Sequence, residues 1–217
     1  MSPLAKAESK PRWERRKDAR PHELLAAALT LFVERGYAAT RLEDVAGRAG
    51  VSKGTLYLYF DNKEDLFKAV IREHLSPVLN DAQSMIDIYT GSTEQLFRDF
   101  VLGWWQRVGD TPLSGITKLM MSEAGNFPEV ARFYHAEIIE RSQRLLVSLL
   151  ERGVARGEFA PLDLKHAHMV IVAPMLMLML WKHSFGPCQA ETVSSRDYLE
   201  CYIALITKGL LTRPEAS

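Results

Sequence analysis

Residues 40–60 of the chain, TRLEDVAGRAGVSKGTLYLYF, decide its fold class. Thr40 and Glu43 have the spacing of a capping box, which starts a helix. Gly50 is placed where that helix must end, because glycine tolerates a positive φ. Ser52 is a suitable N-cap for a second, short helix. Two helices joined by a tight turn predict a helix-turn-helix, the motif whose second helix enters the major groove of DNA.

The second helix of this motif has two distinct faces. Leu56 and Phe60 are four residues apart and are predicted to face the core. Gly54 and Leu58 lie on the opposite side, next to the basic Lys53 and two tyrosines. This outward face contains no acidic residue, as a surface that meets phosphates requires. The alternative is a solvated helix that touches nothing, but glycine, leucine and two tyrosines make a poor solvent face.

These segments resemble the DNA-binding domain of the tetracycline-repressor (TetR/AcrR) family. The resemblance covers roughly residues 18–78 and rests on LFVERGY at 31–37, DVA at 44–46, AGVSKGTLY at 49–57 and KEDLF at 63–67. It implies a three-helix head, a C-terminal helical bundle that binds an effector, and a homodimer that binds double-stranded operator DNA. Beyond the head, the rest of the fold is carried over by analogy.

The resemblance also implies which residues touch DNA. The predicted contact residues are Thr40, Ser52, Lys53, Gly54, Thr55, Tyr57, Leu58, Tyr59 and Lys63. Lysine and the hydroxyl side chains are common donors to phosphate, and a glycine lets the backbone approach closely. Thr40 and Lys63 are expected to anchor phosphates. Leu58 departs from the polar or aromatic residue of many relatives and is expected to pack against a thymine methyl group.

Charge is unevenly distributed along the 217 residues, although the formal net charge is zero. Residues 1–20 carry seven Lys or Arg against three Asp or Glu, an excess of four positive charges. Such an excess predicts added attraction to phosphate, with a solubilising tail as the compatible alternative.

We predict a basic flexible arm at 1–17, a DNA-binding domain at 18–78 with the motif at about 41–60, and an effector-binding and dimerisation domain at 79–217.

Helical periodicity and clear breakers predict an all-α chain of about nine helices, without strand patterns or repeats. Outside the motif, helices are predicted at 22–35, at 63–89 with a bend near Pro77, and at 92–108, 113–124, 128–156, 163–184 and 191–211.

The run 169–181 contains Pro174 and is shorter than the ~20 residues of a membrane span, so it predicts a buried helix and no membrane contact. The first 20 residues lack the apolar core of a signal peptide, and a cytoplasmic protein is expected.

The helix predicted at 163–184 is apolar nearly all round and must be covered on several faces. In the resembled family, the last two helices pair with those of a second copy as a four-helix bundle. The predicted dimer interface comprises Val170, Leu176, Leu180, Tyr198, Tyr202, Leu205 and Ile206. The alternative is burial entirely within the chain.

The middle of the chain is rich in soft apolar side chains, which suit a binding site of adaptable shape. The resemblance implies a pocket for a small apolar effector, and its predicted lining is Met85, Trp104, Trp105, Met120, Met121, Phe127, Phe133, Tyr134, Met175 and Met179. Glu123, His135 and His168 are candidates for the few polar groups of such a pocket. Ordinary core packing is the alternative for each of these residues.

Enzymatic chemistry is not indicated. The sequence contains no glycine-rich phosphate loop, nucleophile elbow or paired cysteine motif. His166 and His168 are two apart and diverge on a helix, and Cys188 and Cys201 are expected to be free thiols. No catalytic residue, metal or cofactor is predicted.

The expected function is a ligand-responsive transcriptional repressor that releases its operator when an apolar small molecule binds. One alternative is an activator or architectural factor of the same fold, controlled by a protein partner. A more remote alternative is a small-molecule-binding protein or an enzyme with a vestigial DNA-binding head.

Overall fold

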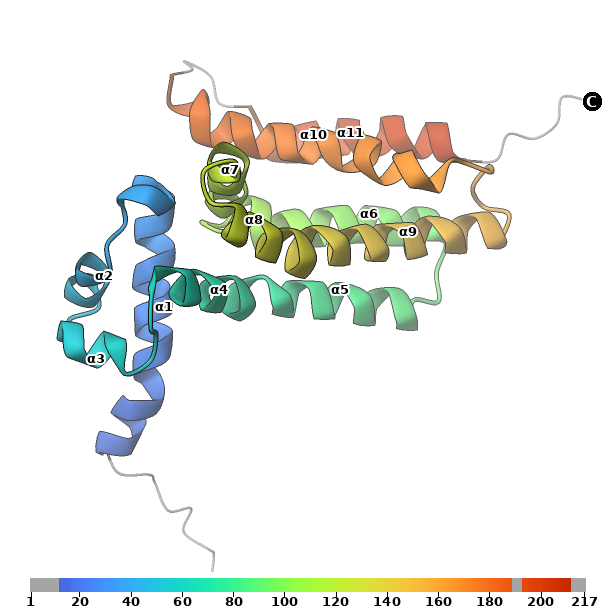
Figure 1. Cartoon of the computed structure of the whole chain (residues 1–217). Coiled ribbons are helices and arrows are strands. Elements are labelled where there is room, and N and C mark those ends of the chain that lie inside the picture. The colour runs from blue at the N-terminus through green and yellow to red at the C-terminus, as the bar shows by residue number, and fades with distance from the viewer. Residues whose placement is uncertain (1–11, 189–192, 212–217) are drawn as a thin grey trace, which may run out of the picture. The chain divides into compact units, whose positions relative to one another are not determined.

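The computed structural model describes residues 12–188 and 193–211, and this part of the chain is all-α, as predicted (Figure 1). Its α-helices are α1 Arg12–Ala39, α2 Leu42–Arg48, α3 Lys53–Tyr57, α4 Lys63–His74, α5 Ser76–Ile88, α6 Thr93–Trp104, α7 Ser114–Glu123, α8 Pro128–Tyr134, α9 Glu140–Ala155, α10 Leu164–Ser184 and α11 Ser195–Leu210. Two π-helical turns, η1 Trp105–Gly109 and η2 His135–Ile139, and the 3-10 turn η3 Gly186–Cys188 complete the list. Because α8, η2 and α9 follow without a break and only Leu75 separates α4 from α5, these elements form nine helical segments, the predicted number.

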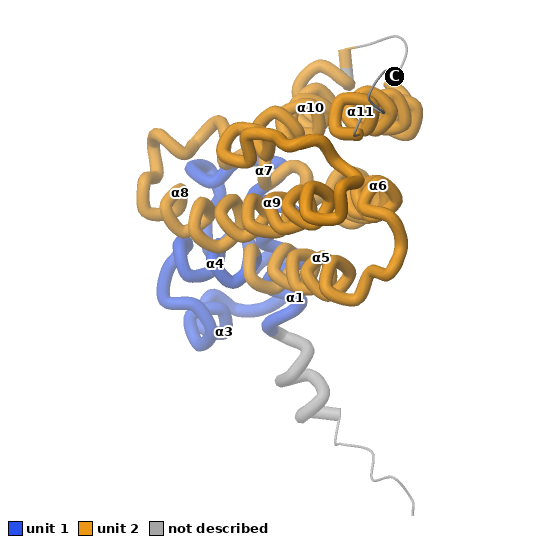
Figure 2. The backbone as a smooth tube through the Cα atoms, turned by 90° about the vertical axis from the view of Figure 1, so that its right-hand side faces the viewer, with its two compact units in different colours: residues 1–70 blue, residues 71–217 orange. Residues whose placement is uncertain are grey.

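The chain divides into two compact units, Met1–Val70 and Ile71–Ser217, and the division falls within α4 (Figure 2). The predicted arm overlaps α1, which already begins at Arg12, whereas residues 1–11 lie outside the described residues.

The first unit is a small head in which α1 packs against α2 and α2 against α3. Its core is apolar and strongly aromatic. The rings of Phe32, Tyr37 and Phe67 lie 5.2 to 5.7 Å apart, with Phe67 edge-on to the other two, a favourable geometry for aromatic rings. Gly36 has φ 84°, which an L side chain rarely adopts, and interrupts the helical backbone of α1 where the sequence predicts its end.

The second unit is a bundle in which α6 packs against α9 and α11, and α10 against α7, α9 and α11 (Figure 1). The predicted helix starts at Ser92, Pro128 and Asp163 are confirmed. The Ser92 hydroxyl accepts from the Gln95 amide at 3.2 Å, and the Asp163 carboxylate accepts from the Lys165 amide at 2.9 Å. Proline occupies the first turn of α8, where its missing N–H costs no hydrogen bond.

The π-helical turn η1 contains one close contact that requires a glycine. A Cβ added at Gly109 would lie 2.3 Å from the Trp105 ring, so only glycine fits beneath this indole. The Trp105 Nε1–H donates to the Asp110 carboxylate at 2.9 Å, and the Asp110 amide donates to the Trp105 carbonyl at the same distance. The Lys182 ammonium of α10 donates to the Gly109 carbonyl at 2.8 Å. The end of this helix is therefore attached to α10.

The prediction that the apolar run of α10 is buried is wrong for one of its faces. Met169, Val170 and Met177 are 64, 63 and 56% exposed, although Ile171, Met175 and Met179 are buried. By length and composition alone α10 could cross a membrane, and only 22% of its most apolar window is buried within the chain. Exposed apolar patches of this kind on a soluble domain usually mark an interaction surface.

Candidate DNA-binding surface and effector region

The turn between α2 and α3 has the geometry that the sequence predicts. Gly50 has φ 66°, and the Val51 amide donates to the Ala46 carbonyl at 2.9 Å. The Ser52 hydroxyl accepts from the Thr55 amide at 3.1 Å and so caps the start of α3. These bonds fix both the start and the direction of α3, which a recognition helix requires.

The two faces of the α3 segment are separated as predicted. Leu56 is 0% exposed and Phe60 is 9% exposed, whereas Leu58 is 81% and Tyr57 42% exposed. The other predicted contact residues of this segment are exposed (Ser52, Lys53 and Gly54) or half-buried (Thr55 and Tyr59). A leucine so exposed contributes little to the core and is available to a partner surface.

The Lys53 ammonium of α3 forms an ion pair with the Glu43 carboxylate of α2, a contact that sequence reasoning missed. The ammonium also lies 5.6 Å from the centre of the Tyr57 ring, a cation–π distance. The hydrogen bond with Lys53 lowers the pKa of Glu43, and the same bond raises the pKa of Lys53, so both groups are charged at neutral pH. The two residues are ten positions apart, and only the angle between the helices brings them together.

The capping box predicted for Thr40 is wrong. Helix α2 begins at Leu42 with Arg41 at the N-cap, and no side chain caps it. Thr40 is 1% exposed, and its Oγ1 lies 2.7 Å from the Gly36 carbonyl and 3.2 Å from the Leu31 carbonyl. The hydroxyl therefore satisfies backbone carbonyls of α1, where that helix is interrupted. A side-chain contact from Thr40 to phosphate would require breaking these bonds.

Lys63, the other predicted phosphate anchor, is half-buried at the start of α4. Its Nζ donates to the Tyr37 carbonyl at 2.7 Å and to the Ala38 carbonyl at 3.0 Å, and it lies 4.6 Å from the Tyr37 ring centre. Lysine at the end of a helix is favourable because carbonyl groups there carry partial negative charge. The structure therefore gives Lys63 a role within the head, joining α4 to the end of α1.

The predicted effector residues are divided between the interior and the surface of the second unit. Trp105, Met120, Tyr134, Met175 and Met179 are buried, Met85, Trp104, Phe127 and Phe133 are half-buried, and Met121 is exposed. At 55% exposure, Met121 is a surface residue rather than part of an enclosed pocket. The Arg72 guanidinium lies 4.9 Å from the Phe133 ring centre, so that ring also has a partner.

One polar pair lies among the buried members of this set. The Tyr134 and Thr117 hydroxyl oxygens are 3.5 Å apart, and both side chains are less than 10% exposed. Burial raises the pKa of Tyr134, so its hydroxyl stays protonated. Thr117, on α7, was not among the predicted residues. Two buried hydroxyls that lie together among apolar side chains are the type of polar group that orients a ligand in an apolar site.

The polar candidates taken from the sequence lie in different environments. His135 is exposed and lies 3.2 Å from the Glu140 carboxylate, and Glu123 is half-buried. His168 is half-buried on α10, and within the described chain its Nδ1 is buried without a hydrogen-bond partner. Among the described residues, no group of three His, Cys, Asp or Glu side chains is placed to hold a metal ion.

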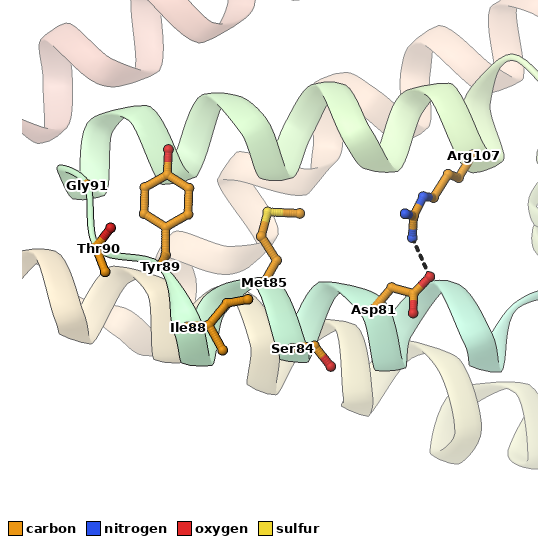
Figure 3. A pocket seen from close by; sticks show the side chains of 8 residues that line it. All are labelled: Asp81, Ser84, Met85, Ile88, Tyr89, Thr90, Gly91 and Arg107. Atoms are coloured by element: carbon orange, nitrogen blue, oxygen red, sulfur yellow. Dashed lines mark hydrogen bonds and ion pairs between the residues drawn. The ribbon is translucent and has the colours of Figure 1, made fainter.

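A groove of about 640 Å³ lies between α5 and the α6–η1 segment (Figure 3). Met85, a predicted pocket residue, lies at its centre and reaches toward α6, where its Cε would be 4.0 Å from a Cβ at Gly103. Arg107 and Asp81 form an ion pair of 2.7 Å at one end of the groove, and Tyr89 lies toward the other. The groove is thus apolar at its centre and charged at one end.

The predicted dimer residues lie on α10 and α11, which are side by side (Figure 1). Val170 and Leu205 are 63 and 67% exposed. Leu176, Leu180, Tyr198 and Ile206 are half-buried. Tyr202 is only 5% exposed, and its hydroxyl donates to the Ile171 carbonyl at 2.7 Å, so it joins the two helices within the chain.

Four exposed apolar residues of this region were missed, namely Met169, Met177, Trp181 and Phe185. Met169, Met177 and Trp181 lie at intervals of four residues from the exposed Ala173, in either direction. That spacing, visible in the sequence, places them along one side of α10. The exposed apolar face of α10 therefore extends along most of its length.

Comparison with known proteins agrees with this geometry. Residues 24–70 match the family model described as bacterial regulatory proteins of the tetR family, and residues 88–195 match the tetracyclin repressor-like C-terminal domain. The HTH-type transcriptional repressor KstR2 of Mycolicibacterium smegmatis is 29% identical over 194 residues, which cover 88% of this chain and 91% of that protein.

Solved structures share the fold at lower identity. The ketosteroid transcriptional regulator KstR2 of Mycobacterium tuberculosis has a TM-score of 0.67 at 21% identity, covering 89% of this chain and 96% of that one. The transcriptional regulator FadR of Bacillus subtilis, in complex with stearoyl-CoA, has a TM-score of 0.70 at 22% identity, covering 87% and 98%. With both of its domains matched by family models, the chain belongs to the TetR family and is a DNA-binding transcriptional regulator.

Proposed function

We propose that this protein is a cytoplasmic transcriptional repressor that binds a two-fold-symmetric operator as a homodimer and releases it when an apolar effector binds. The observation that carries the proposal is the α3 face, which is held in place by the Ser52 cap and exposes Leu58 and Tyr57 beside a lysine. Similarity over nearly the whole length of a repressor supports repression rather than activation.

In this proposal, the exposed and half-buried residues of the α3 segment contact DNA directly. They are Ser52, Lys53, Gly54, Thr55, Tyr57, Leu58 and Tyr59. The hydroxyls and the ammonium bind phosphates or base edges, and Leu58 packs against a thymine methyl group. Thr40 and Lys63 act through the head, because their polar atoms bind carbonyl groups of α1.

The homodimer is formed by α10 and α11. Met169, Val170, Met177 and Leu205 are each more than half exposed, and pairing with a second copy would remove their apolar surface from water. A two-fold dimer also places two copies of α3 about 34–36 Å apart, the separation of successive major grooves on one side of the duplex.

The effector binds in the second unit, between α7, α8 and α10. The buried methionines can adjust to an apolar body, and the hydroxyls of Thr117 and Tyr134 supply the orienting polar groups. The structurally similar FadR of Bacillus subtilis is in complex with stearoyl-CoA, and the similar KstR2 of Mycobacterium tuberculosis is a ketosteroid transcriptional regulator. The proposed effector is therefore a molecule with a long acyl chain or a steroid-like body.

Release of the operator requires that the effector bind the released state more tightly than the DNA-bound state. Moving the population from 99% competent to 99% released needs about 5.5 kcal/mol of differential binding. By linkage, operator DNA must weaken effector binding by the same factor by which the effector weakens DNA binding.

The test uses stearoyl-CoA and a ketosteroid as probes, with binding followed by tryptophan fluorescence. We expect the dissociation constant of the active probe to rise when saturating operator DNA is present, by the factor measured for the reverse effect. A probe that occupies the unit with equal affinity in both conditions would contradict effector-driven release. Control by a protein partner would then be favoured.

A further inference from the structure

We propose that Glu43 competes with DNA phosphates for the Lys53 ammonium, and thereby withholds one positive charge of each head from non-operator DNA. The proposal rests on the DNA-binding role of α3 given above and adds a positioning residue from α2. Its basis is the ion pair that joins the first turn of α2 to the first residue of α3.

The geometry of the pair makes it available to competition. The side chains of Lys53 and Glu43 are 57 and 50% exposed, so a phosphate can reach the ammonium without unfolding the head. The Tyr57 ring holds the lysine on the same side of α3, at 5.6 Å from its ammonium. The turn bond from the Val51 amide to the Ala46 carbonyl fixes one helix against the other. The carboxylate therefore stays close to the ammonium while the head is free.

The chemistry of the pair decides the direction of the effect. While the lysine stays paired with the carboxylate it neutralises no phosphate, so no cation condensed on the DNA at that phosphate is released. Without the carboxylate, the same lysine adds about 0.9 to the slope of log affinity against log salt concentration. A dimer that engages both heads adds about 1.8 to this slope. If the variant and the wild type bind equally at 1 M salt, the variant binds up to about sixtyfold more tightly at 0.1 M and about ninefold more tightly at 0.3 M.

The test measures binding of the full-length protein to a random-sequence, non-operator duplex by fluorescence anisotropy across a salt series. Glu43→Gln should bind more tightly at low salt and steepen the slope by between about 0.9 and 1.8. Glu34→Gln is the matched control. Glu34 forms an ion pair with Arg48 in the same unit and has similar exposure, 47%, so this variant changes net charge equally. It should leave the slope unchanged.

The double variant separates competition from simple repulsion of DNA by Glu43. In a Lys53→Gln background, Glu43→Gln should no longer steepen the slope, because no ammonium is left to release. An undiminished gain in that background, or an equal gain in Glu34→Gln, would overturn the proposal. Circular dichroism and thermal unfolding confirm that each variant is folded.

The same data distinguish this inference from the proposed function. If the wild-type protein binds no duplex at low salt, DNA binding by α3 itself is refuted, and the role of Glu43 with it. If the wild type binds with a salt-dependent affinity that Glu43→Gln leaves unchanged, only the competition is refuted.

Discussion

Leu56 and Leu58 are two residues apart in the α3 segment, yet exchanging each for alanine should have opposite consequences. Leu56 is 0% exposed, and Leu58 is 81% exposed. Truncating a fully buried leucine removes its transfer free energy and leaves a cavity, at a cost of about 2–5 kcal/mol. Truncating an exposed leucine changes the free energy of unfolding by no more than about 0.5 kcal/mol.

Base preference in DNA binding should respond in the opposite way, because Leu58→Ala should change it and Leu56→Ala should not. In Leu58→Ala, the proposed contact with a thymine methyl group would be lost, which should remove about 1 kcal/mol, or about fivefold, of discrimination at one base pair in each half-site. In the part of the Leu56→Ala population that remains folded, base preference should be unchanged because the outward face is intact.

Two assays together test this reasoning. Urea denaturation gives the free energy of unfolding of each variant, and anisotropy with operator duplexes substituted at single positions gives the base preference. A loss of more than about 2 kcal/mol of stability in Leu58→Ala would place this residue in the core. Unchanged preference at every operator position would refute its contact with a base.

Three further predictions follow from other contacts. Lys63→Ala should lower the free energy of unfolding by about 1.5–3 kcal/mol, measured by urea denaturation, since an ammonium bound to two carbonyls is lost; an unchanged stability would restore Lys63 as a phosphate anchor only. Met177→Glu should convert the proposed dimer into a monomer in sedimentation experiments, whereas Ile88→Glu, at a more exposed position on α5, should leave the dimer intact. Thr93 lowers the pKa of Glu158 to about 2, from an ordinary 4.5, first through its side chain and then through its backbone amide. This carboxylate therefore stabilises the fold fully above pH 4.5 and loses its effect as the pH falls toward 2, so the stability difference between wild type and Glu158→Gln should shrink over that range; a constant difference would refute the assignment.

The sequence alone predicts most of the head because its signals are local. The i,i+4 pair of Leu56 and Phe60 defines the inner face of α3, and its N-cap and preceding glycine define the turn. The capping box predicted for Thr40 is wrong for a tertiary reason. The spacing of Thr40 to Glu43 fits a capping box, but the interrupted end of α1 offers its hydroxyl nearer carbonyl partners. Local spacing does not reveal that competition.

The candidate sites depend more on tertiary structure, and less of them could be predicted. The pairing of Glu43 with Lys53 depends on the angle between two helices. The burial of Tyr202, in contrast to the exposure of Met177, depends on how α11 rotates against α10. Composition identifies α10 as apolar but does not indicate which of its sides the chain itself covers.

The most direct test of the account is selection of binding sites by the full-length protein from a pool of random DNA duplexes, followed by sequencing. A dimer that inserts two copies of α3 should enrich an inverted repeat whose half-sites are one helical turn, about 34–36 Å, or a multiple of it, apart. Enrichment of a single, unrepeated site would contradict the account. So would enrichment no greater than the background recovered with the Leu56→Ala variant under conditions that unfold it.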